Sequence, residues 1–394
     1  MIFLSALGIV SALGRGKQEV SKNLFAGHRS GIVARSDLLV DKTPTFVGQV
    51  DGPLPDVPEK LSIYASRNLQ LAITAAEEIR DEIETALTVY GRKRIAVILG
   101  SSTSGIAEGE SAVRFATECG RLPSEFDMRQ QELGSPGEAL AQYLQLEGPA
   151  ISVSTACSSG AQALAMGRRL IRTGLADAVL AGGADSLCRL TINGFKALSA
   201  LSNDICNPFS KNRDGTTIGE GAAIFLMEKR EAPIALLGVG TSTDAYSMTA
   251  PQPEGLGIES AIRQALQGAG LDASEIDYIH LHGTGTKQND AMESTVVSRV
   301  FGADLPCSSS KGQIGHTLGA AGAMGAAHCW LSATSKDGVL PPHLWDQMAD
   351  DGLLSKNLVS VGNRLPASSR RILMSNAIAF GGNNAVLILG RECR

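Results

Sequence analysis

The chain has 394 residues, of which 43% are hydrophobic and 19% charged, and this balance excludes a disordered or fibrous protein. Its net charge of −5 gives no electrostatic reason to expect nucleic-acid binding. Residues 1–8 are apolar without the basic start of a signal peptide, so we expect a first strand there. No apolar run approaches the ~20 residues of a membrane helix. We therefore expect a cytoplasmic protein with no membrane segment.

The cysteines are scattered, with no pair at CxxC spacing and an odd total of 7. This pattern favours the reduced thiols of a cytosolic protein over a disulfide framework or a zinc site. We expect no metal. The cysteines stand at positions 119, 157, 188, 206, 307, 329 and 393.

Several elements occur twice in the same order, which predicts an internal duplication. Each half begins with an apolar stretch and continues with a strand that runs into a loop of Gly, Ser, Thr or His. A turn into a small-residue helix follows, and a Gly-rich turn with a strand closes the half. The first copies lie at 3–8, 95–103, 155–166 and 219–226, and the second at 234–240, 278–284, 308–324 and 381–389.

Helical patterns lie between these elements, at 67–88, 135–146, 257–269 and 291–300. The second pattern has Ser135 placed as a cap and Pro136 at the first helical position. Strands that alternate with helices predict an α/β fold with helix-covered sheets. We expect two similar halves, residues 1–231 and 232–394, that share a core and bring their Gly-rich turns together.

One thiol, Cys157, stands at a predicted strand-to-helix turn within residues 153–160. A helical pattern follows over 162–173, and a helix N-terminus offers partial positive charge and free N–H groups. Such a position favours thiolate, the nucleophilic form of cysteine. Small residues on both sides leave room for a substrate. We predict covalent chemistry at Cys157 rather than a buried, inert thiol.

Two histidines lie on loops that the duplication brings to the same place. His282 follows a predicted strand in a His-Gly-Thr-Gly-Thr loop, with Asp290 and Glu293 a turn or two later. His316 ends the segment 311–316 and enters the small-residue helix. Because both loops lie where strands end, as Cys157 does, we expect one site that contains all three.

Two other readings of these loops are weaker. His280 and His282 are two residues apart on a strand and share a face, but no third metal ligand follows at a usual spacing. The Gly-Thr-Gly-Thr sequence lacks the Lys-Ser/Thr ending of a phosphate-binding loop.

Six short motifs follow one another along the chain, and together they are far more specific than any one alone. They lie at 155–160, 212–215, 244–249, 282–286, 311–316 and 379–383. In this order they resemble the β-ketoacyl-acyl-carrier-protein synthases of the type I/II class, in the thiolase-like superfamily. The resemblance implies two pseudo-duplicated α/β halves in a layered αβαβα core. The N-terminal half would carry the nucleophilic cysteine, and the C-terminal half both histidines and a gating loop.

The resemblance implies that Cys157 accepts an acyl group from a carrier-protein thioester, with the N–H groups of Cys157 and Phe380 as oxyanion hole. His282 and His316 would hold the malonyl thioester oxygen and promote decarboxylation. The resulting carbanion equivalent would attack the acyl-cysteine and lengthen the chain by two carbons. Separating acyl transfer from carbon–carbon bond formation needs a covalent nucleophile. This chemistry requires no cofactor.

Supporting roles around these residues also follow from the resemblance. For Lys311, a purely structural ion pair is an equal alternative to a direct chemical role. The matching positions are a charged network at Lys311, Asp290 and Glu293, contacts with the pantetheine arm or malonyl carboxylate at Thr284 and Thr286, a gating aromatic at Phe380, and the floor of the acyl pocket at Ile106.

Some features depart from the family pattern. Ala379 stands where a glycine usually precedes the gating Phe380, and Ile378 replaces an aromatic residue. We expect the gating loop to open differently, because glycine tolerates dihedral angles that alanine does not. Residues 127–133 replace a more apolar stretch that lines the pocket in fatty-acid enzymes, which argues against a standard saturated acyl pocket. The loop 282–286 resembles polyketide ketosynthases as much as fatty-acid ones.

The leading expectation is thus a β-ketoacyl-acyl-carrier-protein synthase of fatty-acid or polyketide-like synthesis. The alternative is a specialised ketosynthase of a type II polyketide or aryl-polyene-like pathway. The intact set of Cys157, His282 and His316 disfavours a non-catalytic chain-length subunit. A thiolase is disfavoured because the C-terminal Gly-rich turn of this chain lacks a second cysteine. An initiating synthase is disfavoured because that class uses Asn at the position where this chain has His316.

The partners implied by the resemblance are acyl- and malonyl-loaded carrier proteins. It also implies a dimer, either of two identical chains or with a chain-length-factor-like subunit. The sequence leaves this choice open, together with the length and saturation of the acyl chain.

Overall fold

The computed structural model describes residues 1–302, 304–366 and 370–391, so Cys393 lies outside the described residues. Its strands are β1 (Phe3–Ser11), β2 (Gly14–Arg15), β3 (Ile32–Arg35), β4 (Thr45–Gly48), β5 (Ile95–Gly100), β6 (Ala150–Val153), β7 (Ala178–Asp185), β8 (Ile218–Gly219), β9 (Gly221–Glu228), β10 (Ala235–Thr243), β11 (Tyr278–His280), β12 (Cys307–Ser308), β13 (Arg371–Ile378) and β14 (Asn383–Arg391).

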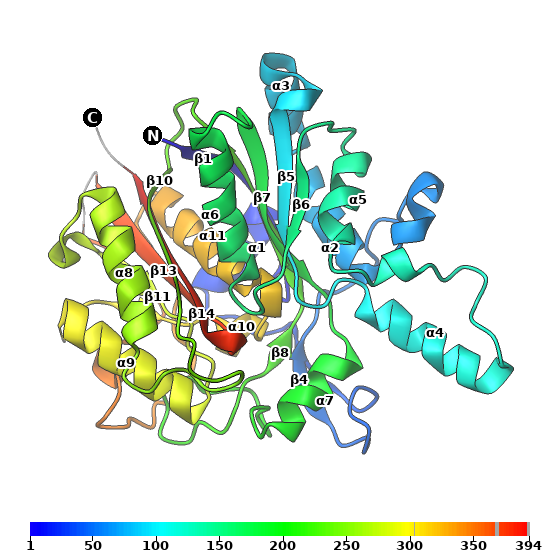
Figure 1. Cartoon of the computed structure of the whole chain (residues 1–394). Coiled ribbons are helices and arrows are strands. Elements are labelled where there is room, and N and C mark those ends of the chain that lie inside the picture. Colours follow the sequence, from blue (N-terminus) through cyan, green and yellow to red (C-terminus); the bar gives the residue numbers. More distant parts are fainter. Residues whose placement is uncertain (303, 367–369, 392–394) are drawn as a thin grey trace.

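Helices surround and separate these strands (Figure 1). The α-helices are α1 (Gly16–Phe25), α2 (Arg67–Glu77), α3 (Arg80–Tyr90), α4 (Ile106–Cys119), α5 (Ser135–Tyr143), α6 (Ser159–Arg172), α7 (Arg189–Ala197), α8 (Leu256–Ala269), α9 (Lys287–Phe301), α10 (Lys311–Ile314) and α11 (Ala321–Thr334). Short 3₁₀ segments are η1 (Glu59–Tyr64), η2 (Arg92–Arg94), η3 (Met128–Gln130), η4 (Ala273–Glu275), η5 (Leu318–Ala320), η6 (Ser355–Asn357) and η7 (Phe380–Gly382).

The order of the strands in the main sheet shows the duplication directly. It runs β12-β11-β13-β14-β10-β1-β9-β7-β5-β6. In one half β6, β5 and β7 are parallel and β9 and β1 antiparallel. In the other, β12, β11 and β13 are parallel and β14 and β10 antiparallel. The halves meet where β1 pairs with β10 at Phe3 and Ala235, and the predicted doubled α/β fold is confirmed.

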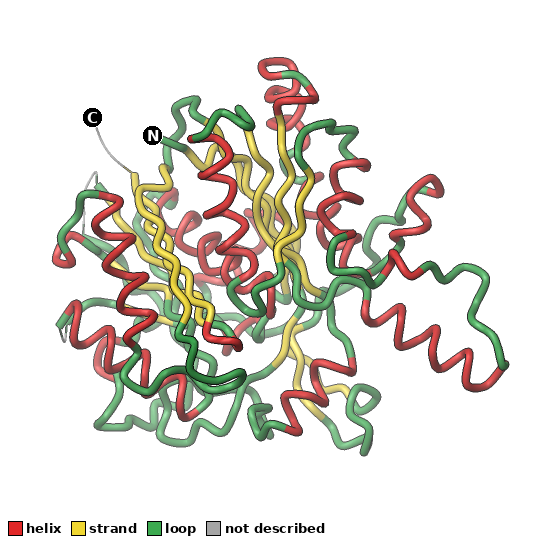
Figure 2. Tube along the Cα trace, in the orientation of Figure 1, coloured by secondary structure: helices red, strands yellow, loops and turns green. Residues whose placement is uncertain are grey.

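The two halves of the sheet alternate with three layers of helices (Figures 1 and 2). Helices α6 and α11 contact each other in the middle, α2 and α5 pack on the first half, and α8 packs on the second. Each of the three helix layers has its own buried apolar cluster, and that of the middle layer includes residues from both halves of the sheet. In the middle layer, a Cβ on Gly160 would lie 2.9 Å from the backbone N of Ala323, and one on Gly322 would lie 2.8 Å from that of Ala161. Glycines thus let the N-terminal ends of α6 and α11 approach closely, which brings the turns before them together.

The outer helices rest on glycines at matching positions in the two halves. A Cβ on Gly8 of β1 would lie 1.8 Å from the carbonyl oxygen of Ala75 in α2. A Cβ on Gly240 of β10 would lie 1.8 Å from the carbonyl oxygen of Ala261 in α8. No side chain fits in either place, so each half needs glycine where its strand at the junction of the halves supports the outer helix.

The expectation of one helix over 67–88 is wrong, because the chain breaks between Glu77 and Arg80 to form α2 and α3. The Glu78 carboxylate accepts a hydrogen bond of 2.8 Å from the N–H of Ile9 in β1. Ile79 follows with φ −115° and ψ 27° and is fully buried. Anchoring to a strand distant in sequence thus overrides the local helical pattern.

The expected cap at Ser135 is also wrong. Gly134 is the N-cap of α5, and Ser135 is its first residue and makes no side-chain cap bond. The N–H of Ser135 already donates to the carbonyl of Glu132 (3.1 Å), so the chain turns one residue earlier than expected. None of the helices in the described part of the chain has the length and apolar character needed to cross a membrane.

Candidate active site

Cys157 lies at the tip of a tight turn between β6 and α6. The preceding residue, Ala156, has a φ of 49°, in the left-handed region that residues other than glycine rarely adopt. The hydroxyl of Ser159 accepts a hydrogen bond from the N–H of Thr155 (2.9 Å) and donates one to the carbonyl of Ala156 (2.6 Å). The turn therefore satisfies its own backbone groups and holds the thiol at the entrance to α6.

The other half contains a similar turn before α11. Leu318 stands three residues before the first residue of α11, as Ala156 does before α6, and has a φ of 50°. His316 lies just ahead of it. Its N–H donates to Thr217 (2.6 Å), and its carbonyl accepts from the N–H of Gly219 (2.9 Å) beside β8. The duplicated turns thus place a thiol and an imidazole opposite each other.

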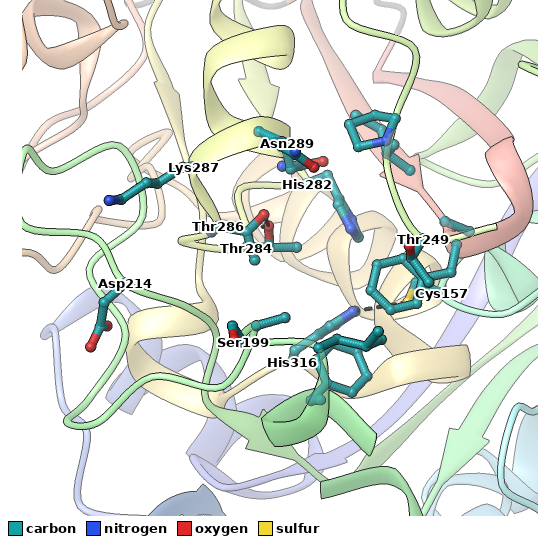
Figure 3. A pocket seen from close by; sticks show the side chains of 18 residues that line it. Cys157, Ser199, Asp214, Thr249, His282, Thr284, Thr286, Lys287, Asn289 and His316 are labelled. Atoms are coloured by element: carbon teal, nitrogen blue, oxygen red, sulfur yellow. Dashed lines mark hydrogen bonds between the residues drawn. The ribbon is translucent and has the colours of Figure 1, made fainter. Parts of the chain in front are cut away.

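A cavity of about 440 Å³ contains the predicted site (Figure 3). His316 Nε2 lies 3.0 Å from Cys157 Sγ. The rings of His282 and His316 lie 5.3 Å apart, nearly perpendicular at 85°. The residues that line the cavity are Cys157, Phe195, Leu198, Ser199, Ala200, Asp214, Thr249, Pro251, His282, Thr284, Thr286, Lys287, Gln288, Asn289, His316, Ile378, Ala379 and Phe380.

Buried charged groups hold the backbone on both sides of His282. The Glu293 carboxylate accepts hydrogen bonds from the N–H groups of His282 and Gly283, both 2.8 Å. The Lys311 ammonium donates to the carbonyl of His282. Asp290 accepts from the N–H groups of Thr284 (3.1 Å) and Gly285 (3.2 Å) in the same loop. The supporting residues therefore surround this loop, and Lys311 contacts a carbonyl there.

Burial decides the protonation of the two imidazoles. It lowers the pKa of His282 and of His316 well below its usual value, and the nearby Lys311 ammonium lowers both further. Both rings are therefore neutral at physiological pH, and each carries one N–H donor. Burial also lowers the pKa of Lys311, while Glu293 opposes that shift.

The expectation that the turn favours a thiolate is wrong for the protein without substrate. Burial raises the pKa of the Cys157 thiol to about 11, despite the opposing effects of Lys311 and of the Phe380 N–H. Desolvation of the charged sulfur outweighs the helix N-terminus. The resting residue is a thiol that needs a base, and His316 Nε2 lies at the right distance to accept its proton.

This pKa predicts a steep pH dependence for alkylation of Cys157 by iodoacetamide. Because the thiolate is the reacting species, the rate is expected to rise about tenfold per pH unit from pH 7 to 10, without levelling off. The measurement is intact mass against time in a Cys119→Ser background, since Cys119 is an exposed competing thiol. A plateau near pH 7 in a folded protein would contradict a raised pKa.

Phe380 closes one side of the cavity. It stacks on Phe195 of α7, with ring centroids 5.3 Å apart and an angle of 18°, and Phe195 meets the His316 ring edge-on at 6.3 Å. Ala379 has φ −124° and ψ 152°, an extended conformation that any residue adopts, while Gly381 has a φ of 79°. The alanine is thus unstrained here, and the turn depends on the glycines after Phe380.

Sequence reasoning did not single out Phe195, because nothing in a lone helical phenylalanine marks it as part of a site. It did not single out Ser199, Lys287 or Asn289 either. Asp214 and Thr249 lie in two of the six motifs, which was the available signal.

Lys311, Asp290 and Glu293 do not line the cavity themselves, but they hold the loop of His282, which does. Ile106 is not brought to the site. It is the first residue of α4 and is absent from the described residues that line the cavity. In Figures 1 and 2, α4 projects from the side of the molecule. Within the described residues, no group of three or more His, Cys, Asp or Glu could hold a metal ion.

Comparisons with known proteins agree with this geometry. The family model for the N-terminal domain of beta-ketoacyl synthases matches residues 2–232, and that for the C-terminal domain matches residues 234–345. Nodulation protein E of Rhizobium meliloti (strain 1021) is 32% identical over 98% of both chains. The 3-oxoacyl-[acyl-carrier-protein] synthase 2 of Coxiella burnetii is 31% identical over 99% of this chain and 98% of its own.

A solved structure of a ketosynthase is also similar to this chain in sequence and fold. A ketosynthase in complex with its chain length factor from Xenorhabdus doucetiae is 45% identical, with a TM-score of 0.94 over 99% of this chain and 98% of that chain. The chain belongs to the β-ketoacyl synthase family. The resemblance inferred from the six motifs is confirmed, and with it the assignment as a condensing acyltransferase of the 3-oxoacyl-acyl-carrier-protein synthase class.

Proposed function

We propose that this β-ketoacyl-acyl-carrier-protein synthase works through Cys157, His282 and His316. One observation carries the proposal: a thiol and two neutral imidazoles from different halves of the chain share one cavity, with Sγ 3.0 Å from His316 Nε2. A nucleophile within hydrogen-bond reach of a base is the arrangement that covalent acyl transfer requires.

The first step is acyl transfer from a carrier-protein thioester. Cys157 Sγ attacks the thioester carbon as its proton passes to His316 Nε2. The oxyanion that forms is held by the N–H groups of Cys157 and Phe380, both of which lie against the sulfur. The carbon–sulfur bond to the carrier breaks, and the leaving carrier thiolate takes the proton from His316, which is neutral again.

The second step is decarboxylative condensation with a malonyl-loaded carrier. The bond to the malonyl carboxylate breaks, CO₂ leaves, and the electron pair passes into an enolate. The neutral rings of His282 and His316 donate N–H hydrogen bonds to the enolate oxygen. For His316 the donor in this step is Nε2, the nitrogen that faces Cys157, so the ring is in the tautomer that carries its proton there. The enolate carbon then attacks the acyl carbon and the bond to Cys157 breaks. The thiolate that leaves takes up one proton from solvent, because release of CO₂ supplies none. The product is a β-ketoacyl chain two carbons longer.

The remaining residues position these groups. Lys311 and Glu293 hold the two sides of His282, and Asp290 orders the loop after it. Thr284 and Thr286 line the cavity, where they contact the pantetheine arm or the malonyl carboxylate.

Phe380 is proposed as the gate over Cys157. Its stack on Phe195 holds the closed position, and Phe195 in turn contacts His316. Acylation of the sulfur displaces Phe380 and opens the cavity toward the acyl chain.

A second candidate function is narrower: a specialised ketosynthase of a type II polyketide or aryl-polyene-like pathway that pairs with a chain-length-factor-like subunit. The support is the 45% identical ketosynthase that was solved with its chain length factor. Helix α4 and the loop after it also expose apolar side chains, with exposed fractions of 63% at Val113, 50% at Leu122, 56% at Met128 and 44% at Leu133. A partner subunit would cover this face and complete the acyl pocket near Ile106. The alternative to such a heterodimer is a homodimer, in which a second copy of this chain covers the same face.

The proposal extends to organisation and location. The halves are 1–231 and 232–394, supported by the two matching sets of five strands. The location is cytoplasmic, supported by free thiols at the six cysteines of the described chain.

Intact-mass spectrometry tests the substrate. The enzyme is incubated with carrier proteins that bear saturated, unsaturated or aryl-conjugated chains, and malonyl carrier protein is then added. Acylation at Cys157 followed by a two-carbon extension is expected. Preference for conjugated chains supports the specialised pathway, and preference for saturated chains supports fatty-acid synthesis. No acylation of the folded enzyme, alone or with its co-purifying subunit, would refute the catalytic role.

A further inference from the structure

A second pair of imidazoles, His280 and His328, is buried behind the active site. Neither is among the described residues that line the cavity, and their exposed fractions are 4% and 0%. His328 Nδ1 lies 3.4 Å from His280 Nε2, and the ring centroids are 5.4 Å apart. The proposed reaction uses neither ring directly, so these buried polar groups require another explanation.

His280 connects two segments that carry active-site residues. It ends β11, two residues before His282, and its Nε2 lies 3.1 Å from Ser310 Oγ. Ser310 immediately precedes Lys311 and is the N-cap residue of α10, but its side chain makes no cap hydrogen bond. The Ser310 hydroxyl is therefore available for His280 and joins the segment of His282 to that of Lys311.

The same two segments meet at a second point, where Lys311 donates to the carbonyl of His282. His316 is attached differently, because its backbone is hydrogen-bonded to the chain at β8. The backbones of the two segments are also joined by the Ser309 hydroxyl, which donates to the Gly283 carbonyl (2.8 Å), and by the N–H of Leu281, which donates to the Ser308 carbonyl (2.8 Å). Loss of the contact between His280 and Ser310 would therefore leave these backbones paired and change only how Ser310 and Lys311 are held against His282, while His316 would stay beside Cys157.

The packing around His280 is adapted to an imidazole. A Cβ on Gly325 of α11 would lie 3.0 Å from His280 Nδ1 and 2.5 Å from Ser375 Oγ, so glycine makes room for the ring. Ser375 Oγ and His328 Nε2 are buried and have no hydrogen-bond partner within the described chain. Unpaired buried polar groups are costly, so apolar side chains would serve packing better. This polar cluster is better explained by a role in the reaction than by stability.

Charged and titratable groups face His280 from each element packed against it: Lys311 from α10, His328 and Cys329 from α11, and His343 from the loop that follows α11. Burial lowers the pKa of His280 well below its usual value, and His328, Lys311 and His343 lower it further. Burial lowers the pKa of His328 to about 3. Both rings are therefore neutral, and the contacts are the same throughout the working pH range.

We propose that His280, supported by His328, is a positioning residue for decarboxylation: through Ser310 it fixes the segment of Lys311 relative to His282. It does not touch the substrate. Acyl transfer to Cys157 depends on His316 and is largely independent of this contact. The inference rests on the roles proposed above for His282 and His316.

Three substitutions at one position test this. His280→Phe keeps a ring but removes both nitrogens, His280→Asn places an amide near the Nδ1 position, and His280→Gln places one near Nε2, the atom that faces Ser310. For malonyl-carrier-protein decarboxylation, we expect kcat to fall about 10- to 100-fold in the Phe and Asn variants with KM little changed. His280→Gln should recover most of the loss. Acylation of Cys157 by acyl carrier protein, followed by intact mass, should stay within about twofold of the parent enzyme in all three.

If His280 served only packing, the order of the decarboxylation rates would differ: the Phe variant would be at least as active as the Gln variant. Equal losses in both half-reactions with a lowered Tm, or normal decarboxylation by a folded Phe variant, would overturn the proposal. If His280→Phe does not fold, Ser310→Ala removes the same contact and should show the same split between half-reactions; normal decarboxylation by Ser310→Ala would also overturn it. A parent enzyme that neither decarboxylates malonyl carrier protein nor acylates Cys157 would instead refute the proposed function.

Discussion

Replacement of Cys157 by alanine is expected to abolish condensation and leave malonyl decarboxylation in place. Loss of a covalent nucleophile removes the whole acyl-transfer step, so condensation should fall by about 10⁴-fold or more. The two imidazoles that stabilise the enolate remain, so acetyl carrier protein should still form from malonyl carrier protein. The measurement is product mass with acyl and malonyl carrier proteins together, and with malonyl carrier protein alone.

The matched control is Cys307→Ala, at a second buried cysteine, which lies in β12 and does not line the cavity. That variant should keep both acylation and condensation. A Cys157→Ala enzyme that still takes up an acyl group would place the nucleophile elsewhere and contradict the proposed reaction.

Replacement of His282 by alanine is expected to remove decarboxylation while Cys157 is still acylated. One N–H donor to the enolate is lost, which corresponds to a decrease of about 10²- to 10³-fold in kcat. Acylation should persist, because His316 is the ring that contacts the sulfur, at 3.0 Å. Single-turnover acylation and CO₂ release measure the two half-reactions separately, and His28→Ala, at an exposed histidine, is the control.

The lowered pKa of His282 also gives this reaction a pH signature. Because the folded-state pKa lies well below the usual value, the ring is already neutral at pH 6 and stays neutral at pH 8. Decarboxylation by the parent enzyme should therefore not decline as pH rises through 6.5. A decline there would mean that a protonated imidazole is the active form. In the His282→Ala variant, a loss of acylation equal to the loss of decarboxylation would mean that both rings serve both steps.

The proposed roles of His280 and Phe195 point to the same organisation of the site. Each contacts a catalytic segment from behind or from the side, and neither was singled out as part of the site from the sequence. In the structure His280 contacts Ser310 and His328. The sequence did not indicate that Ser310, the residue before Lys311, lies beside His280 at the end of β11.

The sequence alone was enough for the duplication, the α/β class, the turn at Cys157 and the loops of His282 and His316. These features depend on local chemistry: glycines and small residues mark tight turns, and apolar periodicity marks strands and helices. Two helix ends were placed wrongly, because Glu78 bonds to β1 and because the turn before Ser135 begins early.

Only the tertiary structure decided the protonation states, the stack of Phe195 on Phe380, the buried pair of His280 and His328, and the separation of Ile106 from the cavity. Each depends on which residues distant in sequence exclude water from one another. The Cys157 turn shows the difference: its local sequence favours a thiolate, but burial between the two halves raises the pKa to about 11 and makes the neighbouring imidazole necessary. Desolvation is a property of the assembled core, and no local pattern encodes it.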